Sequence, residues 1–291
     1  MKTMKKIVVA VDFSEATVPA CEFAVFLAKA TNSSLILFHT YFDQIIVAGG
    51  SYPDTMASQT LVDMKMVNEI KANAEREMSQ LKLQVEKLID ASGGAIPLSS
   101  QLEGGDVDYE LAEQCKVLEP DLLIIGQQGK GKKSLFGGAM TSRILRHSCV
   151  PVLTIPVGNV PRAFERAAII VDQDHTITED LGLILSFLEP FNTDLKCLFL
   201  SKGEKSFKEE DEVLRNMRLG LGKLNRGDIS ISTMTGKKEE LLVSDYLRDN
   251  PQDLLIIQER RRAWFSQLFG SGLSADDLLN FEVPLLIFPQ K

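Results

Sequence analysis

Short apolar runs alternate along this chain with longer segments in which apolar residues recur every three or four positions. The runs predict strands at 7–11, 35–38, 96–102, 122–125 and 152–155, and the periodic segments predict helices at 15–30, 58–91 and 107–118. The order then repeats, with strands predicted at 168–171, 195–200, 229–234, 254–257 and 285–288 and helices at 179–188, 208–224 and 238–248. Strands that alternate with helices favour parallel sheets covered on both faces.

The two halves of the chain also share short motifs at a nearly fixed spacing. DLLIIG ends at Gly126 and DLLIIQ ends 132 positions later at Gln258, an offset that Gly138 and Gly270 keep. Such self-similarity predicts a duplicated domain. The breaker-rich connection at 156–161 separates the copies, so we predict domains at 1–157 and 163–291. The predicted fold class is α/β, with two tandem doubly wound domains, each with a five-stranded parallel sheet and helices on both faces.

Composition narrows the function classes further. The chain has 291 residues, of which 44% are hydrophobic, enough for two apolar cores. A net charge of −8 argues against a surface that binds nucleic acid, although it leaves room for a local basic pocket. No run approaches the ~20 apolar residues that cross a bilayer, and the charged start followed directly by a strand is unlike a secretion signal. We therefore expect a cytoplasmic protein without nucleic-acid or membrane partners.

Four cysteines are spread far apart and lie inside apolar patterns: Cys21, Cys115, Cys149 and Cys197. They form no CxxC pair, which argues against a zinc site. Isolated cysteines in apolar segments are typical of buried reduced thiols in a cytoplasmic protein.

The strongest candidate for chemistry is the glycine-rich segment that follows the strand at 122–125. It contains Gly126, Gly129, Gly131, Gly137 and Gly138. Glycines let successive backbone N–H groups surround an anion, and a helix predicted to start near residue 140 would point its amino terminus at the same anion. Asp12 directly follows the first strand. Because ligands of doubly wound sheets bind beyond the carboxyl ends of the strands, Asp12 and this loop are predicted to share a phosphate-binding site.

Two other interpretations of this loop remain open. The glycines are also compatible with a surface connection that binds nothing. Gly126 to Lys132 fits GxxxxGK, but Lys133 stands where a P-loop needs a hydroxyl residue for magnesium, which argues against a P-loop NTPase. The lysines Lys130, Lys132 and Lys133 either neutralise phosphates or are simply solvated.

The remaining polar clusters favour structural roles. Asp172, Asp174 and His175 lie on one predicted loop, where such residues usually face solvent, so we predict no metal site. His39 ends an apolar strand and is interpreted as a partly buried structural histidine. No nucleophile is paired with a base, so no catalytic residue is predicted. The apolar stripe from Met66 to Leu88 is expected to be core.

These motifs resemble the universal stress protein family, specifically its tandem members, over essentially the whole chain. The family's signature after the fourth strand is Gly, two residues, Gly, nine residues, Gly and then Ser or Thr. Gly126 and Gly129 match its first part. Gly138 matches the third glycine with eight intervening residues, and Ala139 replaces the hydroxyl residue.

That resemblance implies a site for ATP, with or without magnesium. Asp12 would contact the nucleoside, and Thr40, after the second strand, would lie beside the adenine. Backbone contacts to ribose and phosphates would come from Gly126, Gly129, Gly138, Ala139 and Met140. Ala139 lacks a side-chain donor, which Thr141 would partly replace. The family's fifth strands commonly pair, so the resemblance also implies edge-strand pairing, within the chain or in a homodimer.

The second half departs from this pattern. Gln258 and Arg261 stand where Gly126 and Gly129 stand, and such side chains would block a phosphate cradle. The glycine-rich loop, together with the family resemblance, therefore implies an adenine-nucleotide-binding stress-response regulatory module that binds ATP in its first domain only. The alternatives are a ligand-free oligomerising interaction scaffold and an enzyme that hydrolyses ATP slowly.

Overall fold

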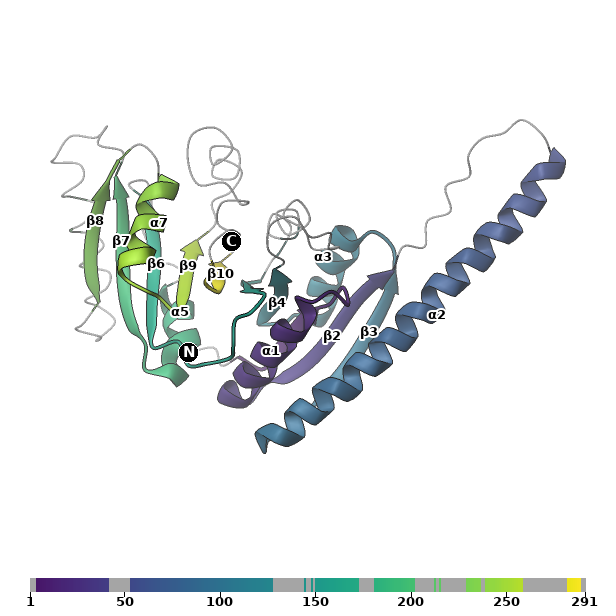
Figure 1. The fold of residues 1–291 in the computed structure, drawn as a ribbon, viewed down its shortest axis with the longest axis horizontal. Helices are drawn as coiled ribbons and strands as arrows, with labels where there is room; N and C mark the ends of the chain where they lie inside the picture. Colours follow the sequence, from purple (N-terminus) through teal and green to yellow (C-terminus); the bar gives the residue numbers. More distant parts are fainter. Residues whose placement is uncertain are drawn as a thin grey trace.

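In the computed structural model, the described residues form one ten-stranded sheet flanked by helices (Figure 1). The described residues are 4–41, 53–127, 144, 148, 150–172, 181–201, 212, 215, 229–236, 239–258 and 282–288. We call β1 to β5 with their helices the first half, and β6 to β10 with theirs the second half.

The first half contains β1 (Lys6–Ala10), α1 (Thr17–Thr31), β2 (Ser34–Tyr41), α2 (Pro53–Ser92), β3 (Leu98–Gly104), α3 (Val107–Leu118), β4 (Leu122–Gln127) and β5 (Val152–Pro156). The second half contains β6 (Arg166–Asp172), α5 (Leu181–Leu188), the 3-10 helix η1 (Glu189–Phe191), β7 (Asp194–Ser201), β8 (Ser230–Thr235), α7 (Glu239–Asp249), β9 (Leu254–Gln258) and β10 (Leu285–Phe288). Each predicted strand is present, with ends shifted by up to three residues. The helix predicted at 208–224 lies almost wholly outside the described residues.

The strands lie in the order β3-β2-β1-β4-β5-β10-β9-β6-β7-β8. Neighbours within each half are parallel, whereas β5 and β10 are antiparallel, with Leu153 opposite Leu286. Each half therefore has the predicted five parallel strands, in the same order relative to its own sequence. The two fifth strands pair within this chain, which is the first of the two pairings that the resemblance implied.

Apolar side chains alternate between the two faces of the sheet, as successive residues of a strand must. Ile7 and Val9 face α1, α2 and α5, whereas Val8 and Ala10 face the side of α3 and α7. Helices thus cover both faces in each half. Both apolar clusters contain residues from both halves, so the core continues through the β5–β10 seam.

Helix α2 is longer than the sheet that it covers. Its 40 residues give a length of about 60 Å. Ala74, Met78, Leu81 and Val85 are buried, but Met66 is 61% exposed. The amino-terminal part of α2 projects past the ends of β2 and β3 (Figure 1). The prediction that the whole apolar stripe is core is therefore wrong at Met66.

The repeated DLLII motifs make equivalent hydrogen bonds. Asp121, before β4, accepts the backbone N–H groups of Lys5 and Lys6 on Oδ2, at 2.8 and 3.1 Å. Asp253, before β9, accepts the backbone N–H of Arg166 on its own Oδ2 at 2.9 Å. In both halves this aspartate accepts hydrogen bonds from the backbone at the start of the first strand, and so joins the fourth strand to it. The repeated sequence motif therefore has a repeated structure.

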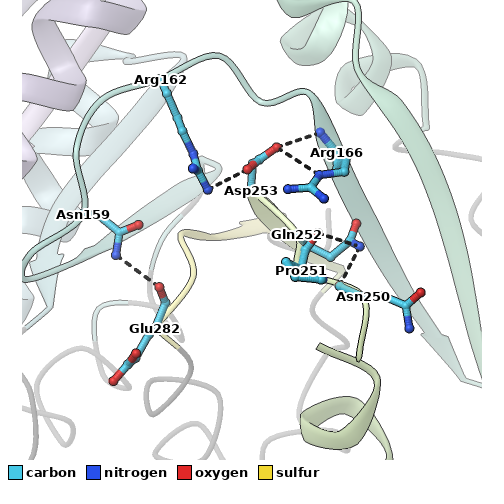
Figure 2. A network of polar contacts seen from close by, with 8 residues as sticks. All are labelled: Asn159, Arg162, Arg166, Asn250, Pro251, Gln252, Asp253 and Glu282. Carbon is cyan, nitrogen blue, oxygen red and sulfur yellow. Dashed lines mark hydrogen bonds and ion pairs between the residues drawn. The ribbon is translucent and has the colours of Figure 1, made fainter. Parts of the chain in front are cut away.

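Asp253 also receives a side chain from the connection between the halves. Figure 2 shows Asp253 between Arg162 and Arg166, with Arg162 Nη2 at 2.6 Å from Oδ1 and Arg166 Nε at 3.8 Å from Oδ2. Nearby, Asn159 Nδ2 donates to the carbonyl of Glu282 at 3.1 Å. The connection is thus attached to the second half by polar contacts at two points.

Three of the four cysteines lie in the described part of the chain, and all three are buried, as predicted: Cys21, Cys115 and Cys197. Burial raises the pKa of Cys21 and of Cys197 to about 12. Cys149 lies outside the described residues. A helix that combines the length and the apolar character needed to cross a bilayer is absent from the described part of the chain.

Candidate functional site

The carboxyl ends of β2, β1 and β4 lie side by side, and three predicted site residues lie there. Ala10 of β1 is level with Phe38 of β2 and with Ile125 of β4. Strands are spaced ~4.8 Å apart, so Asp12, Thr40 and Gly126 converge at one edge of the sheet. The sequence predicted this edge for Asp12 and Gly126, whereas Thr40 was placed near it only by the family resemblance.

Thr40 differs in one respect from the expectation. It lies inside β2, opposite Glu103 of β3, rather than after the strand, and its side chain is buried. The strand is longer than its apolar run because β3 continues to pair with it through Tyr41.

Asp12 organises the turn between β1 and α1. Its Oδ1 accepts the backbone N–H of Ser14 at 3.0 Å and the hydroxyl of Thr17 at 3.1 Å. Between them, Phe13 has a left-handed backbone with φ of 56°, which is uncommon for a residue with a bulky side chain. The carboxylate is therefore held in a fixed orientation at the start of α1.

Gly126 is required by packing. A Cβ at this position would lie 2.1 Å from the backbone oxygen of Ala16 and 2.8 Å from its Cβ, far inside van der Waals contact. Gly126 therefore lets the amino end of α1 rest directly on β4. Packing against Ala16 thus requires a glycine at position 126 whether or not a ligand binds there.

His39 lies next to this turn and is buried. Its Nδ1 donates to the carbonyl of Val11 at 2.6 Å, since a carbonyl can only accept, and its ring centroid lies 4.4 Å from that of Phe13. Burial lowers the pKa of His39, against smaller opposing effects of the Val11 hydrogen bond, Asp12 and Glu77. His39 is a neutral structural residue, as the sequence suggested, and more deeply buried than expected.

We expect stability to fall on mild acidification because of His39. Its folded-state pKa lies below its unfolded value of about 6.5, so the unfolded chain binds more protons as pH falls through that range. The stability contributed by neutral His39 is present above pH ~6.5 and is lost below it, towards the lowered pKa. Melting temperatures from pH 7.5 to 5.5 should fall more steeply for wild type than for His39→Asn, whose amide can still donate to Val11. If the melting temperature falls equally with pH in wild type and in His39→Asn, His39 does not cause the loss of stability.

The Universal stress protein family model matches residues 3–156. The chain belongs to the universal stress protein family. A universal stress protein from Archaeoglobus fulgidus is similar in fold over 98% of this chain and 96% of that one, with TM-score 0.67 and 14% identity. A putative universal stress protein from Pseudomonas aeruginosa UCBPP-PA14 has TM-score 0.59 and 15% identity, covering 98% and 93% of the two chains. No curated protein matches the sequence.

The family signature is only partly visible in the structure. Of the predicted site residues from Gly126 onward in this universal stress protein, Gly126 is described, whereas Gly129, Gly138, Ala139, Met140 and Thr141 lie outside the described residues. The same is true of the three loop lysines and of Asp174 and His175. Among the residues that are described, no group of His, Cys, Asp and Glu is arranged to hold a metal ion.

Several residues at this edge were not predicted from the sequence. Ser14 and Thr17 bind Asp12, and the pattern Asp-x-Ser-x-x-Thr is a readable signal of such a turn. Gln127 and Thr154 form a buried pair, with the Thr154 hydroxyl donating to Gln127 Oε1 at 3.1 Å. Because Gln127 and Thr154 are 27 positions apart, no local sequence pattern predicts their contact.

Proposed function

We propose that the first half of this universal stress protein binds an adenine nucleotide, ATP, and acts as a stress-response regulatory module. The observation that carries this proposal is the convergence of Asp12, Thr40 and Gly126 at adjacent strand ends, directly before the glycine-rich loop. The carboxyl edge of a doubly wound sheet is where such folds bind ligands.

The chemistry of the edge supports a nucleoside there. The Asp12 carboxylate is an acceptor held in place by Ser14 and Thr17, suited to a ribose hydroxyl or an exocyclic amine. Glycine N–H groups of the loop that follows would bind the phosphates, with the lysines as counter-charges.

We propose further that residues 1–157 and 163–291 are separate domains and that the second binds no nucleotide in this way. The equivalent strand order in the two halves supports the division. Gln258 and Arg261, at the places of Gly126 and Gly129, support the loss of the second cradle.

The main alternative is a ligand-free scaffold that oligomerises through its fifth strands. In this structure β5 lies between β4 and β10, and β10 lies between β9 and β5. Both edges of each fifth strand are therefore already paired inside the chain, which counts against that mode of assembly.

Isothermal titration calorimetry of the full chain tests the proposal, with ATP, ADP and AMP, each with and without magnesium. We add cAMP to this panel, since one solved universal stress protein is a complex with cAMP. We expect about one ATP bound per chain. Absence of both heat and thermal shift with every nucleotide would refute the proposal, and phosphate release measured in parallel would reveal slow hydrolysis.

Asp12→Asn locates the site, because asparagine retains the oxygen that accepts from Ser14 and Thr17 but loses the charge. We expect about tenfold weaker ATP binding with little change in melting temperature. Asp172→Asn is the matched control, since Asp172 ends β6 as Asp12 follows β1. Equal effects of the two variants would place the site elsewhere.

A further inference from the structure

Helix α1 contacts the candidate site at its amino end. The Thr17 hydroxyl donates to Asp12 at 3.1 Å, and the Thr17 backbone N–H donates to the Ser14 carbonyl at 3.0 Å. Ala16, just before the helix, rests on Gly126. The position of α1 therefore sets the geometry of the turn that carries Asp12.

The middle of the same helix packs against the second half. Phe23 stacks on Phe164, from the connection between the halves, with ring centroids 6.3 Å apart. Phe26 stacks on Phe191 of η1 at 5.8 Å. Phe164 also contacts Phe187 of α5 at 5.8 Å and Phe191 at 5.3 Å. We call these five rings the aromatic cluster.

The helix has little freedom to move between these two contacts. Ala16, Ala20, Ala24 and Ala28 recur every four residues and are all buried, so the backbone of α1 lies close to the sheet. Thr17 and Phe26 are nine residues apart, or about 14 Å along a rigid helix. Close-packed interiors transmit small displacements instead of absorbing them, so a shift at the cluster displaces the amino end.

We propose that the second half positions the nucleotide site of the first half through α1, with Phe191 and Phe164 as positioning residues. This inference rests on the proposed function. It gives the second half, which has lost the glycine cradle, a role in binding at the first. Neither phenylalanine lies at the strand ends where the ligand would bind, so each acts only through the helix.

Phe191→Leu tests the proposal, because leucine keeps an apolar side chain but loses the ring that stacks on Phe26. Leu198→Val is the matched control: Leu198 is buried in the same half, but on the face of the sheet opposite α1. Two measurements are made on both variants and on wild type. One is the Kd for ATP, and the other is hydrogen exchange at the Ser14 and Thr17 amides without ligand.

We expect Phe191→Leu to raise the Kd about fivefold to tenfold and to accelerate exchange at both amides. Leu198→Val should leave the Kd within about twofold and the exchange unchanged. If wild type binds ATP and Phe191→Leu binds it equally well, or if the control weakens binding as much, the positioning role is wrong. If wild type binds no ATP, the proposed function fails, and the positioning role is then judged from amide exchange alone. Faster exchange in Phe191→Leu but not in Leu198→Val supports the positioning role. Equal exchange in the two variants overturns it.

Discussion

Gly126→Ala is expected to destabilise the protein by about 3 kcal/mol and to abolish measurable ATP binding in the first half. The added Cβ would lie 2.1 Å from the Ala16 backbone oxygen, and a backbone atom cannot rotate away as a side chain can. Either β4 or the start of α1 must shift, and the turn at Asp12 shifts with it. Urea denaturation and calorimetry with ATP measure the two effects.

Gly182→Ala is the control for this substitution. Gly182 lies in α5 of the second half, and a Cβ there would meet no atom within 4 Å. Alanine is the better helix former by about 1 kcal/mol, so this variant should be slightly more stable than wild type and bind ATP normally. A Gly126→Ala protein with wild-type stability would show that α1 does not rest on β4 as described.

Phe164→Ala is expected to cost about 4 kcal/mol, because the ring is fully buried and contacts three other rings. Phe164 contacts α1 through Phe23 and α5 through Phe187. Its loss should therefore weaken the coupling between the halves as well as total stability. Calorimetry should show one unfolding transition for wild type and two for Phe164→Ala.

Phe199→Ala provides the comparison. Phe199 is equally buried, but it lies within β7 and forms no ring contact with α1 among the described aromatic pairs. We expect a similar loss of stability with a single transition retained, since the cluster at the junction is intact. Two transitions in both variants would mean that any core loss separates the halves, and that Phe164 has no special place between them.

The pairing of β5 with β10 gives the second half a structural role in this protein. Pairing of β5 with β10 closes two sheet edges that would otherwise be exposed, and the apolar core continues across it. Removing the second half would expose β5 and one side of α1, so its packing stabilises the first half independently of any ligand.

Much of this architecture was predictable from the sequence. Backbone geometry gives strands and helices different apolar periods, so the ten strands, the bounds of α3 and the duplication were readable from local patterns. The placement of Asp12 and Gly126 at one edge also followed, because the carboxyl ends of parallel strands lie at the same edge of a sheet. Their adjacency came only with the strand order of the structure. Burial of Cys21, Cys115 and Cys197 followed from the apolar segments around them.

Other features were decided only by tertiary structure. The reason for Gly126 is Ala16, which is 110 positions away, and the aromatic cluster joins α1 to residues more than 130 positions later. The 61% exposure of Met66, within an apolar stripe that is mostly buried further along α2, depends on what packs against that part of the helix. Local periodicity records which face of an element is apolar, but it does not record which segment packs against that face. The packing partner depends on how distant segments come together. In this protein it determines how the second half contacts α1, the helix that begins at the candidate site.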